Sequence, residues 1–218
     1  MTNAKKAKRQ RRDNRPQQRR SGTRNTWLAL AALASVLVIV AVVLSSGGGS
    51  SATPGAITDL VDPARVSIDR AAGAALQPGE DLPAFSAPSL DGNGSVAWST
   101  FEGSPAVIAI WAPWCPHCQV ELPRLASALQ DHPSVRLVTI VTAIGQEPGP
   151  QPEQYMSDES LSFPVAVDDT DLSLLNGMGV QSFPTTYYVG SDGKVVTSTV
   201  GEVDPEQLHA ILTQVEAA

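Results

Sequence analysis

Cysteine and histidine are scarce in this chain, and their scarcity excludes several kinds of protein. The 218 residues include two cysteines and three histidines, and the cysteines lie together in one short stretch, at Cys115 and Cys118. A small domain held together by disulfides needs more cysteines, spread through the chain. Covalent haem attachment needs a histidine directly after the second cysteine, where this chain has Gln119. A chemically reactive C-x-x-C pair is not excluded by these observations.

Basic residues are rare after the first 24 positions. Residues 1–24 hold ten of the 15 Lys and Arg residues and one acid, Asp13, for a charge of about +9. The rest of the chain has five basic and 21 acidic residues, a charge of about −16. A basic head and an acidic body are best considered separately. The acidic body argues against nucleic-acid binding and favours neutral or basic segments of partner proteins.

An uncharged apolar run extends from Trp27 to Leu44, directly after the basic head. It lacks the polar face of a soluble core helix, and at about 1.5 Å per residue it is long enough to span a bilayer. We therefore predict a transmembrane helix over residues 27–45, preceded by a basic cytoplasmic tail over residues 1–26. The positive-inside rule then places everything after Ser45 outside the cytoplasm. We therefore expect a single-pass protein of the cell membrane, with a cytoplasmic N-terminus.

A cleaved signal peptide is the alternative interpretation of this N-terminal region. Against it, the basic region is about 24 residues long, and the apolar run exceeds the usual 7–15 residues of such a signal. Small residues between Ala52 and Ala56 would still permit cleavage. Lipoprotein processing has no acceptor, because no cysteine follows the run directly.

Beyond the apolar run, residues 46–81 are predicted to be a Gly/Ser-rich linker and a transitional segment, in which Pro63 weakens a possible short helix over 57–72. A compact domain is expected over residues 82–218. Hydrophobic periodicity and turn residues predict strands at 85–90, 96–101, 106–111, 135–142, 163–167, 185–189 and 194–200. Helices are predicted directly after the cysteines, with Val120, Leu122 and Leu125 on the apolar face and a kink at Pro123, and at 153–161, 171–178 and from the N-cap Asp204 onward. Alternating strands and helices that end in a hairpin and a helix indicate an α/β fold, with a central mixed sheet covered on both faces.

The stretch Cys115-Pro116-His117-Cys118 stands where a buried strand leads into a helix. A helix N-terminus favours an anion, so a thiolate at Cys115 would be stabilised there as nucleophile and leaving group. Pro116 costs nothing at a position whose N–H has no helical partner. Cys118, one turn further along, can resolve a mixed disulfide by attacking Cys115. The expected cofactor is therefore none beyond a redox-active Cys115–Cys118 disulfide.

His117 bears on the direction of electron flow. An imidazole beside Cys115 can stabilise the thiolate and hence the reduced pair, which makes the disulfide a stronger oxidant. The alternative is that His117 is an exposed spacer without influence on the cysteines.

The run from Trp111 through Trp114 to Cys118, followed by Pro123, resembles the active-site strand and kinked helix of thioredoxin-fold proteins. The continuation from Gln119 to Pro123, with Glu121, is similar to that of the TlpA-like branch, the tethered extracytoplasmic thioredoxins. Phe183-Pro184 matches the cis-proline loop of the family. The resemblance implies a thioredoxin fold with an N-terminal β-hairpin, an attacking Cys115 supported by Trp114, and a resolving Cys118. It also implies a cis Pro184 that lets the Phe183 backbone pair with an extended substrate chain.

Two features depart from related patterns. Cytoplasmic thioredoxins carry a buried acid two residues before the first Trp, where this chain has Ala109. Proton transfer at Cys118 then falls to water or to Glu121, whose alternative role is that of a solvated helix residue. The Pro-His dipeptide resembles that of Dsb-type oxidases, but the 65 residues between Cys118 and Pro184 leave no room for their helical insert.

The sequence thus predicts a membrane-anchored extracytoplasmic thiol–disulfide oxidoreductase, tending toward disulfide formation. Its expected partners are exported cysteine-containing client proteins, a redox protein that recycles the pair, and the membrane through residues 27–45; no nucleic acid and no bound metal are expected. Two alternatives are a reductase of exported thiols, of the cytochrome c maturation type, and a thioredoxin-fold copper-binding chaperone. The second is weakened because His132 and His209 lie far from the cysteines in sequence.

Overall fold

A computed structural model describes residues 60–218 of the chain. The predicted cytoplasmic tail, the predicted transmembrane helix and residues 46–59 of the predicted linker and transitional segment fall outside this range. Within residues 60–218, none of the helices is both long and apolar enough to cross a membrane.

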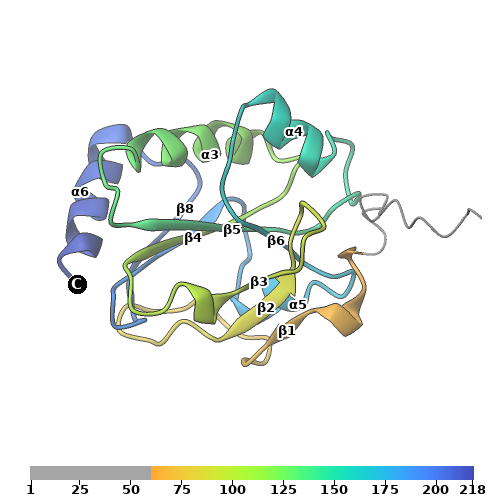
Figure 1. Ribbon diagram of the computed structural model, residues 1–218, viewed down its shortest axis with the longest axis horizontal. Helices are drawn as coiled ribbons and strands as arrows, with labels where there is room; N and C mark the ends of the chain where they lie inside the picture. Colours follow the sequence, from red (N-terminus) through yellow and green to blue (C-terminus); the bar gives the residue numbers. More distant parts are fainter. Residues whose placement is uncertain (1–59) are drawn as a thin grey trace, which may run out of the picture. The chain divides into compact units, whose positions relative to one another are not determined.

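A five-stranded mixed sheet forms the centre of the domain, in the order β6-β5-β4-β7-β8 (Figure 1). Its strands are β4 (Ala106–Trp111), β5 (Arg136–Val141), β6 (Val165–Val167), β7 (Thr185–Val189) and β8 (Val195–Val200). All six residues of β4 are buried. This strand pairs parallel with β5 and antiparallel with β7, so it has a neighbour on each edge and a layer on each face. A continuous apolar run is what such a doubly covered strand requires.

Three helices cover one face of the sheet: α3 (Pro116–Ala128), α4 (Pro152–Asp158) and α6 (Pro205–Glu216) (Figure 1). Helix α3 packs against α6 and contains Pro123, as predicted. Leu122 and Leu125 are fully buried, but Val120 is 41% exposed, so its predicted place on the apolar face is wrong. The residues at apolar helical spacing cover a wider strip of the helix surface than the strip that packs against the sheet.

The other face of the sheet carries a small antiparallel sheet in the order β1-β2-β3, together with helix α5 (Ser173–Gly177) (Figure 1). Strands β2 (Phe85–Pro88) and β3 (Ser95–Ala97) are the predicted hairpin, with 3₁₀ turn η2 (Trp98–Thr100) directly after it. The predicted mixed sheet with layers on both faces and an N-terminal hairpin is confirmed.

The domain begins before Leu82, where the sequence places its start. Leu60 is buried in the core beneath the helices, and β1 (Ser67–Ile68) pairs with β2. Within the possible short helix over 57–72, the structure has 3₁₀ turn η1 (Pro63–Arg65) and this strand instead. The backbone N–H of Leu76 then donates to the Tyr187 hydroxyl at 3.2 Å. These contacts join residues far apart in sequence, so local patterns did not reveal them.

Candidate active site

The two cysteines lie at the junction of the central strand and the first helix. Cys115 is the N-cap of α3, with Pro116 as the first helical residue, and Cys118 follows within the first turn. Both are free thiols. Cys115 is 5% exposed and Cys118 is fully buried. Burial, reinforced by a hydrogen bond with Cys115, raises the pKa of the Cys118 thiol far above its ordinary value. Cys118 is therefore held as a protonated thiol beneath the more accessible Cys115.

The Phe183–Pro184 loop faces this pair. The Phe183–Pro184 peptide bond is cis, as the family resemblance implied. The Cys115 thiol lies 3.8 Å from the Phe183 carbonyl oxygen, within range of a weak sulfur hydrogen bond. Strand β7 starts directly after Pro184 and pairs with β4, so the sheet itself holds the loop opposite the cysteines. The structure thus brings together Cys115, Cys118, Phe183 and Pro184.

Trp114 connects the cysteine loop to its surroundings. Its indole Nε1 donates to the Ala143 carbonyl at 2.8 Å, and its ring meets Phe183 edge-on with centroids 5.7 Å apart. The loop after β5 packs on it so closely that a Cβ at Gly149 would lie 2.6 Å from the Trp114 Cα. Glycine is required at 149 because any larger residue would displace the loop or the tryptophan.

Glu121 is fully buried, so its alternative role as a solvated helix residue is wrong. Its Oε2 accepts the Val203 backbone N–H at 3.1 Å and lies 3.9 Å from the Arg124 guanidinium. Its Oε1 finds no hydrogen-bond partner within residues 60–218. Burial raises the pKa of this carboxyl, with the Val203 N–H and the Arg124 charge opposing the shift. Glu121 is three residues from Cys118 on α3, a spacing that puts two side chains on one helix face.

His117 lies at the surface, with 68% of its side chain exposed. Its Nδ1 is 2.8 Å from Oε1 of Glu202, and the other oxygen of Glu202 is 2.9 Å from Arg124. Sequence reasoning did not identify Glu202. It is 85 residues away in the chain, in the loop before α6, and no local motif marks it.

The other two histidines lie together on the same side of the sheet as the helices. His132 and His209, distant in sequence, are neighbours, with His132 Nε2 at 3.2 Å from His209 Nδ1 and His132 Nδ1 at 2.9 Å from Glu216. In the part of the chain that the structure describes, no group of three or more His, Cys, Asp or Glu residues is arranged to hold a metal ion.

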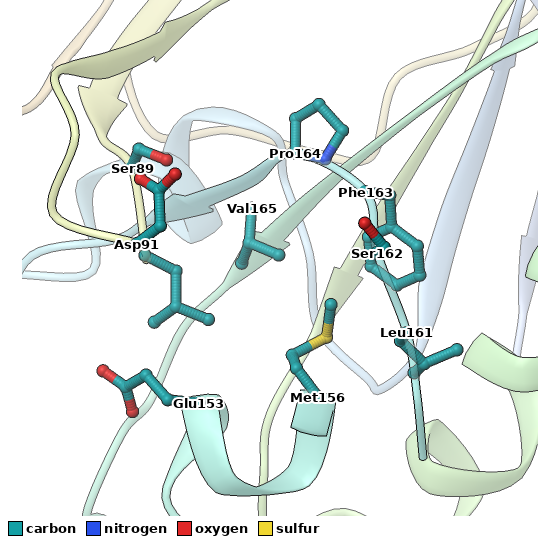
Figure 2. A pocket seen from close by; sticks show the side chains of 10 residues that line it. Ser89, Asp91, Glu153, Met156, Leu161, Ser162, Phe163, Pro164 and Val165 are labelled. Carbon is teal, nitrogen blue, oxygen red and sulfur yellow. The ribbon is translucent and has the colours of Figure 1, made fainter. Parts of the chain in front are cut away.

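A cavity of about 590 Å³ lies apart from the cysteines. Figure 2 shows it between the β2–β3 turn, α4 and the segment leading into β6. Met156 and Phe163 supply apolar walls, and Asp91 and Glu153 supply acidic groups. Its lining includes neither cysteine and none of the residues of the cis-proline loop.

A buried strand that runs into a C-x-x-C helix N-terminus, opposite a cis-proline loop, defines a thioredoxin-fold dithiol site. Known proteins agree with this class. The profile of the AhpC/TSA family matches residues 78–198. Thiol-disulfide oxidoreductase ResA of Bacillus thuringiensis is 27% identical over 140 residues, which are 64% of this chain and 79% of the relative.

Two solved structures have the same fold. A thiol:disulfide interchange protein DsbE from Chlorobium tepidum superposes with a TM-score of 0.56 at 24% identity, over 66% of this chain and 98% of its own. A secreted Mycobacterium tuberculosis disulfide oxidoreductase gives a TM-score of 0.52 at 25% identity, over 60% of this chain and 95% of its own. The chain therefore belongs to the AhpC/TSA family, and within the thioredoxin superfamily it is a thiol–disulfide oxidoreductase of the TlpA-like kind.

Proposed function

We propose that this protein is a membrane-anchored extracytoplasmic oxidoreductase, which exchanges disulfides with exported proteins through Cys115 and Cys118 and works toward disulfide formation. The observation that carries the exchange activity is the asymmetry of the pair. Cys115 caps the helix beside the Phe183 carbonyl, whereas Cys118 is fully buried with a raised thiol pKa. Such a pair has one sulfur for the partner protein and one for resolution.

In the oxidising direction, a client thiolate attacks Cys115 Sγ of the Cys115–Cys118 disulfide. The S–S bond breaks, and Cys118 leaves with the electron pair and takes up a proton. A second client thiolate then attacks the client sulfur of the mixed disulfide and releases the Cys115 thiolate at the helix N-terminus. Two electrons have passed from the client to the pair, and a redox partner must remove them before the next cycle.

Glu121 is suited to handling the proton of Cys118. It is buried on the same face of α3, with a raised carboxyl pKa and an oxygen that no group within residues 60–218 engages. A carboxyl group whose pKa is raised by burial is closer in pKa to the Cys118 thiol, and a small difference in pKa favours efficient proton transfer. The role that cytoplasmic thioredoxins give to an acid on the central strand is thus proposed for an acid on the helix.

Trapping tests the role of each cysteine. Cys118→Ser should hold a mixed disulfide between Cys115 and a cysteine-containing peptide, because the resolving thiolate is gone. Cys115→Ser should form no such adduct. Intact-mass measurement distinguishes the two variants, and stable adducts on Cys118 instead of Cys115 would contradict the assignment.

The direction rests on His117, and the equilibrium potential against glutathione tests it. The C-x-x-C proteins span roughly −120 to −270 mV, with oxidants at the upper end. A value below about −240 mV would refute the oxidising direction. Reduction of exported thiols is the second candidate, because the contact of His117 with Glu202 draws the imidazole toward a carboxylate.

Anchoring rests on the apolar run at 27–45 and the basic residues before it. Full-length protein should pellet with membranes and resist extraction by carbonate, and a version starting at residue 46 should not. Release of the full-length protein by carbonate would contradict the anchor.

A further inference from the structure

The short loop that carries Glu202 contacts several residues of the redox site. Together with its neighbours Gly201 and Val203, Glu202 connects strand β8 to helix α6. The Gly201 N–H donates to the Pro184 carbonyl at 2.8 Å, so the loop is attached to the cis-proline segment. The Val203 N–H donates to the buried Glu121 at 3.1 Å. Between these two anchors, the Glu202 carboxylate contacts His117 at 2.8 Å and Arg124 at 2.9 Å.

The charge of Glu202 determines how His117 is held. The hydrogen bond with His117 is the largest cause of the lowered pKa of Glu202, and Arg124 adds to it. Glu202 is therefore ionised at neutral pH and only accepts hydrogen bonds. It follows that Nδ1 of His117 carries a proton in this contact. One carboxylate thus fixes both the orientation and the hydrogen-bonding state of the one ionisable side chain between the two cysteines.

The Pro-His dipeptide favours a strongly oxidising pair only when a positive imidazole is free to act on the Cys115 thiolate. In this structure the imidazole is directed to a carboxylate, and the negative charge of Glu202 offsets its field. Arg124 contacts the same carboxylate and helps to hold it in place. The thiolate is therefore left with less electrostatic stabilisation than the dipeptide alone would supply.

From this arrangement we infer that Glu202 is a positioning residue that lowers the reduction potential of the Cys115–Cys118 pair, by holding His117 and weakening its influence on the thiolate. The inference builds on the proposed exchange activity, and it concerns a difference between variants, so it does not depend on which way electrons flow in the cell. It accounts for the combination of an oxidase-like dipeptide with a TlpA-like frame.

The test is the equilibrium of the full-length protein with glutathione, measured for Glu202→Gln against the wild type. Loss of the carboxylate should make the disulfide easier to reduce, shifting the equilibrium constant about threefold, which is roughly 14 mV at about 30 mV per tenfold change. Glu206→Gln is the matched control. Glu206 lies in the first turn of α6, beyond the loop, and its loss removes the same charge without touching the contacts of His117 or Arg124.

A double-mutant cycle with His117→Gln separates positioning from a direct charge effect. If Glu202 acts through His117, then His117→Gln/Glu202→Gln should have the potential of His117→Gln alone. An equal shift in both backgrounds, or no shift in Glu202→Gln, would overturn the inference. Circular dichroism melting identifies any variant that does not fold, and Glu202→Asp, which keeps the charge, gives a second measurement in that event. Failure of the trapping experiment with Cys118→Ser would instead refute the exchange activity itself.

Discussion

Two buried carboxylates, Asp168 at the β6–α5 junction and Glu121 in α3, are treated in opposite ways by their surroundings. Asp168 Oδ1 accepts the backbone N–H groups of Asp169 and Leu174 at 3.0 and 2.8 Å. Its Oδ2 accepts the Thr142 hydroxyl at 2.7 Å and the Leu175 N–H at 3.0 Å. Glu121 has one N–H donor, from Val203, and an oxygen without a partner within residues 60–218.

The contrast separates a structural acid from one suited to chemistry. Burial is the leading cause of the raised carboxyl pKa at both positions. Four donors make Asp168 an anchor that joins the end of β5, the end of β6 and the start of α5. Leaving a buried oxygen unsatisfied costs free energy of about 1–3 kcal/mol, and such costs concentrate where function requires them. Glu121 bears that cost one helical turn from Cys118.

Replacing each carboxylate by its amide tests this contrast, and the largest effect on folding is expected at Asp168. Asp168→Asn puts an N–H₂ group where an oxygen accepted two donors, so those donors lose their partner. The free energy of unfolding should fall by about 2–4 kcal/mol, measured by urea denaturation. A loss below 1 kcal/mol would show that the four hydrogen bonds are not what holds this junction.

At Glu121 the same change should slow the reaction without destabilising the fold. Glu121→Gln keeps an acceptor for the Val203 N–H but cannot take a proton from Cys118. We expect disulfide exchange with a reduced peptide to slow about tenfold or more, within the usual range for general acid–base groups, while the free energy of unfolding does not fall. Stopped-flow tryptophan fluorescence measures the rate. An unchanged rate would remove Glu121 from the proposed proton path.

The smallest effect is a pH dependence of stability. Because burial raises the folded-state pKa of Glu121 above its ordinary 4.5, the folded protein binds more protons than the unfolded chain in the window above pH 4.5. Stability from this group is therefore complete below pH 4.5 and is lost as the pH rises through the folded-state pKa.

Glu121→Gln removes this component, so the stability of the variant relative to the wild type should increase from pH 4.5 upward and then level off. The total gain should be about 1.4 kcal/mol for each unit by which the folded-state pKa of Glu121 exceeds its ordinary value. Urea unfolding of both proteins from pH 4 to 8 measures it. Asp168→Asn should remain less stable than the wild type over this pH range, because the lost hydrogen bonds outweigh any relief from burying a charge. A relative stability that falls with pH would contradict the raised pKa of Glu121.

Local patterns predicted much of the domain. Strand β4 was predicted with its observed bounds, because a strand with neighbours on both edges and layers on both faces must be apolar throughout. Helix α6 begins at the predicted cap, where Asp204 accepts the Glu206 N–H at 2.9 Å. By contrast, the start of the domain was placed too late, since β1 has two residues and its evidence lies in its pairing with β2.

The sequence by itself determined the chemistry of this protein: a C-x-x-C pair after a buried strand, with a Phe-Pro loop that resembles its cis-proline partner. These features are local, and backbone preferences and burial impose them on short stretches of chain. Only the tertiary structure decided the environment of the pair. It buried Glu121 and left one of its oxygens without a partner in the described domain, and it placed Glu202 against His117 across 85 residues. Charge and solvation depend on what meets in space, so they emerged only when β8, α6 and the cysteine helix packed together.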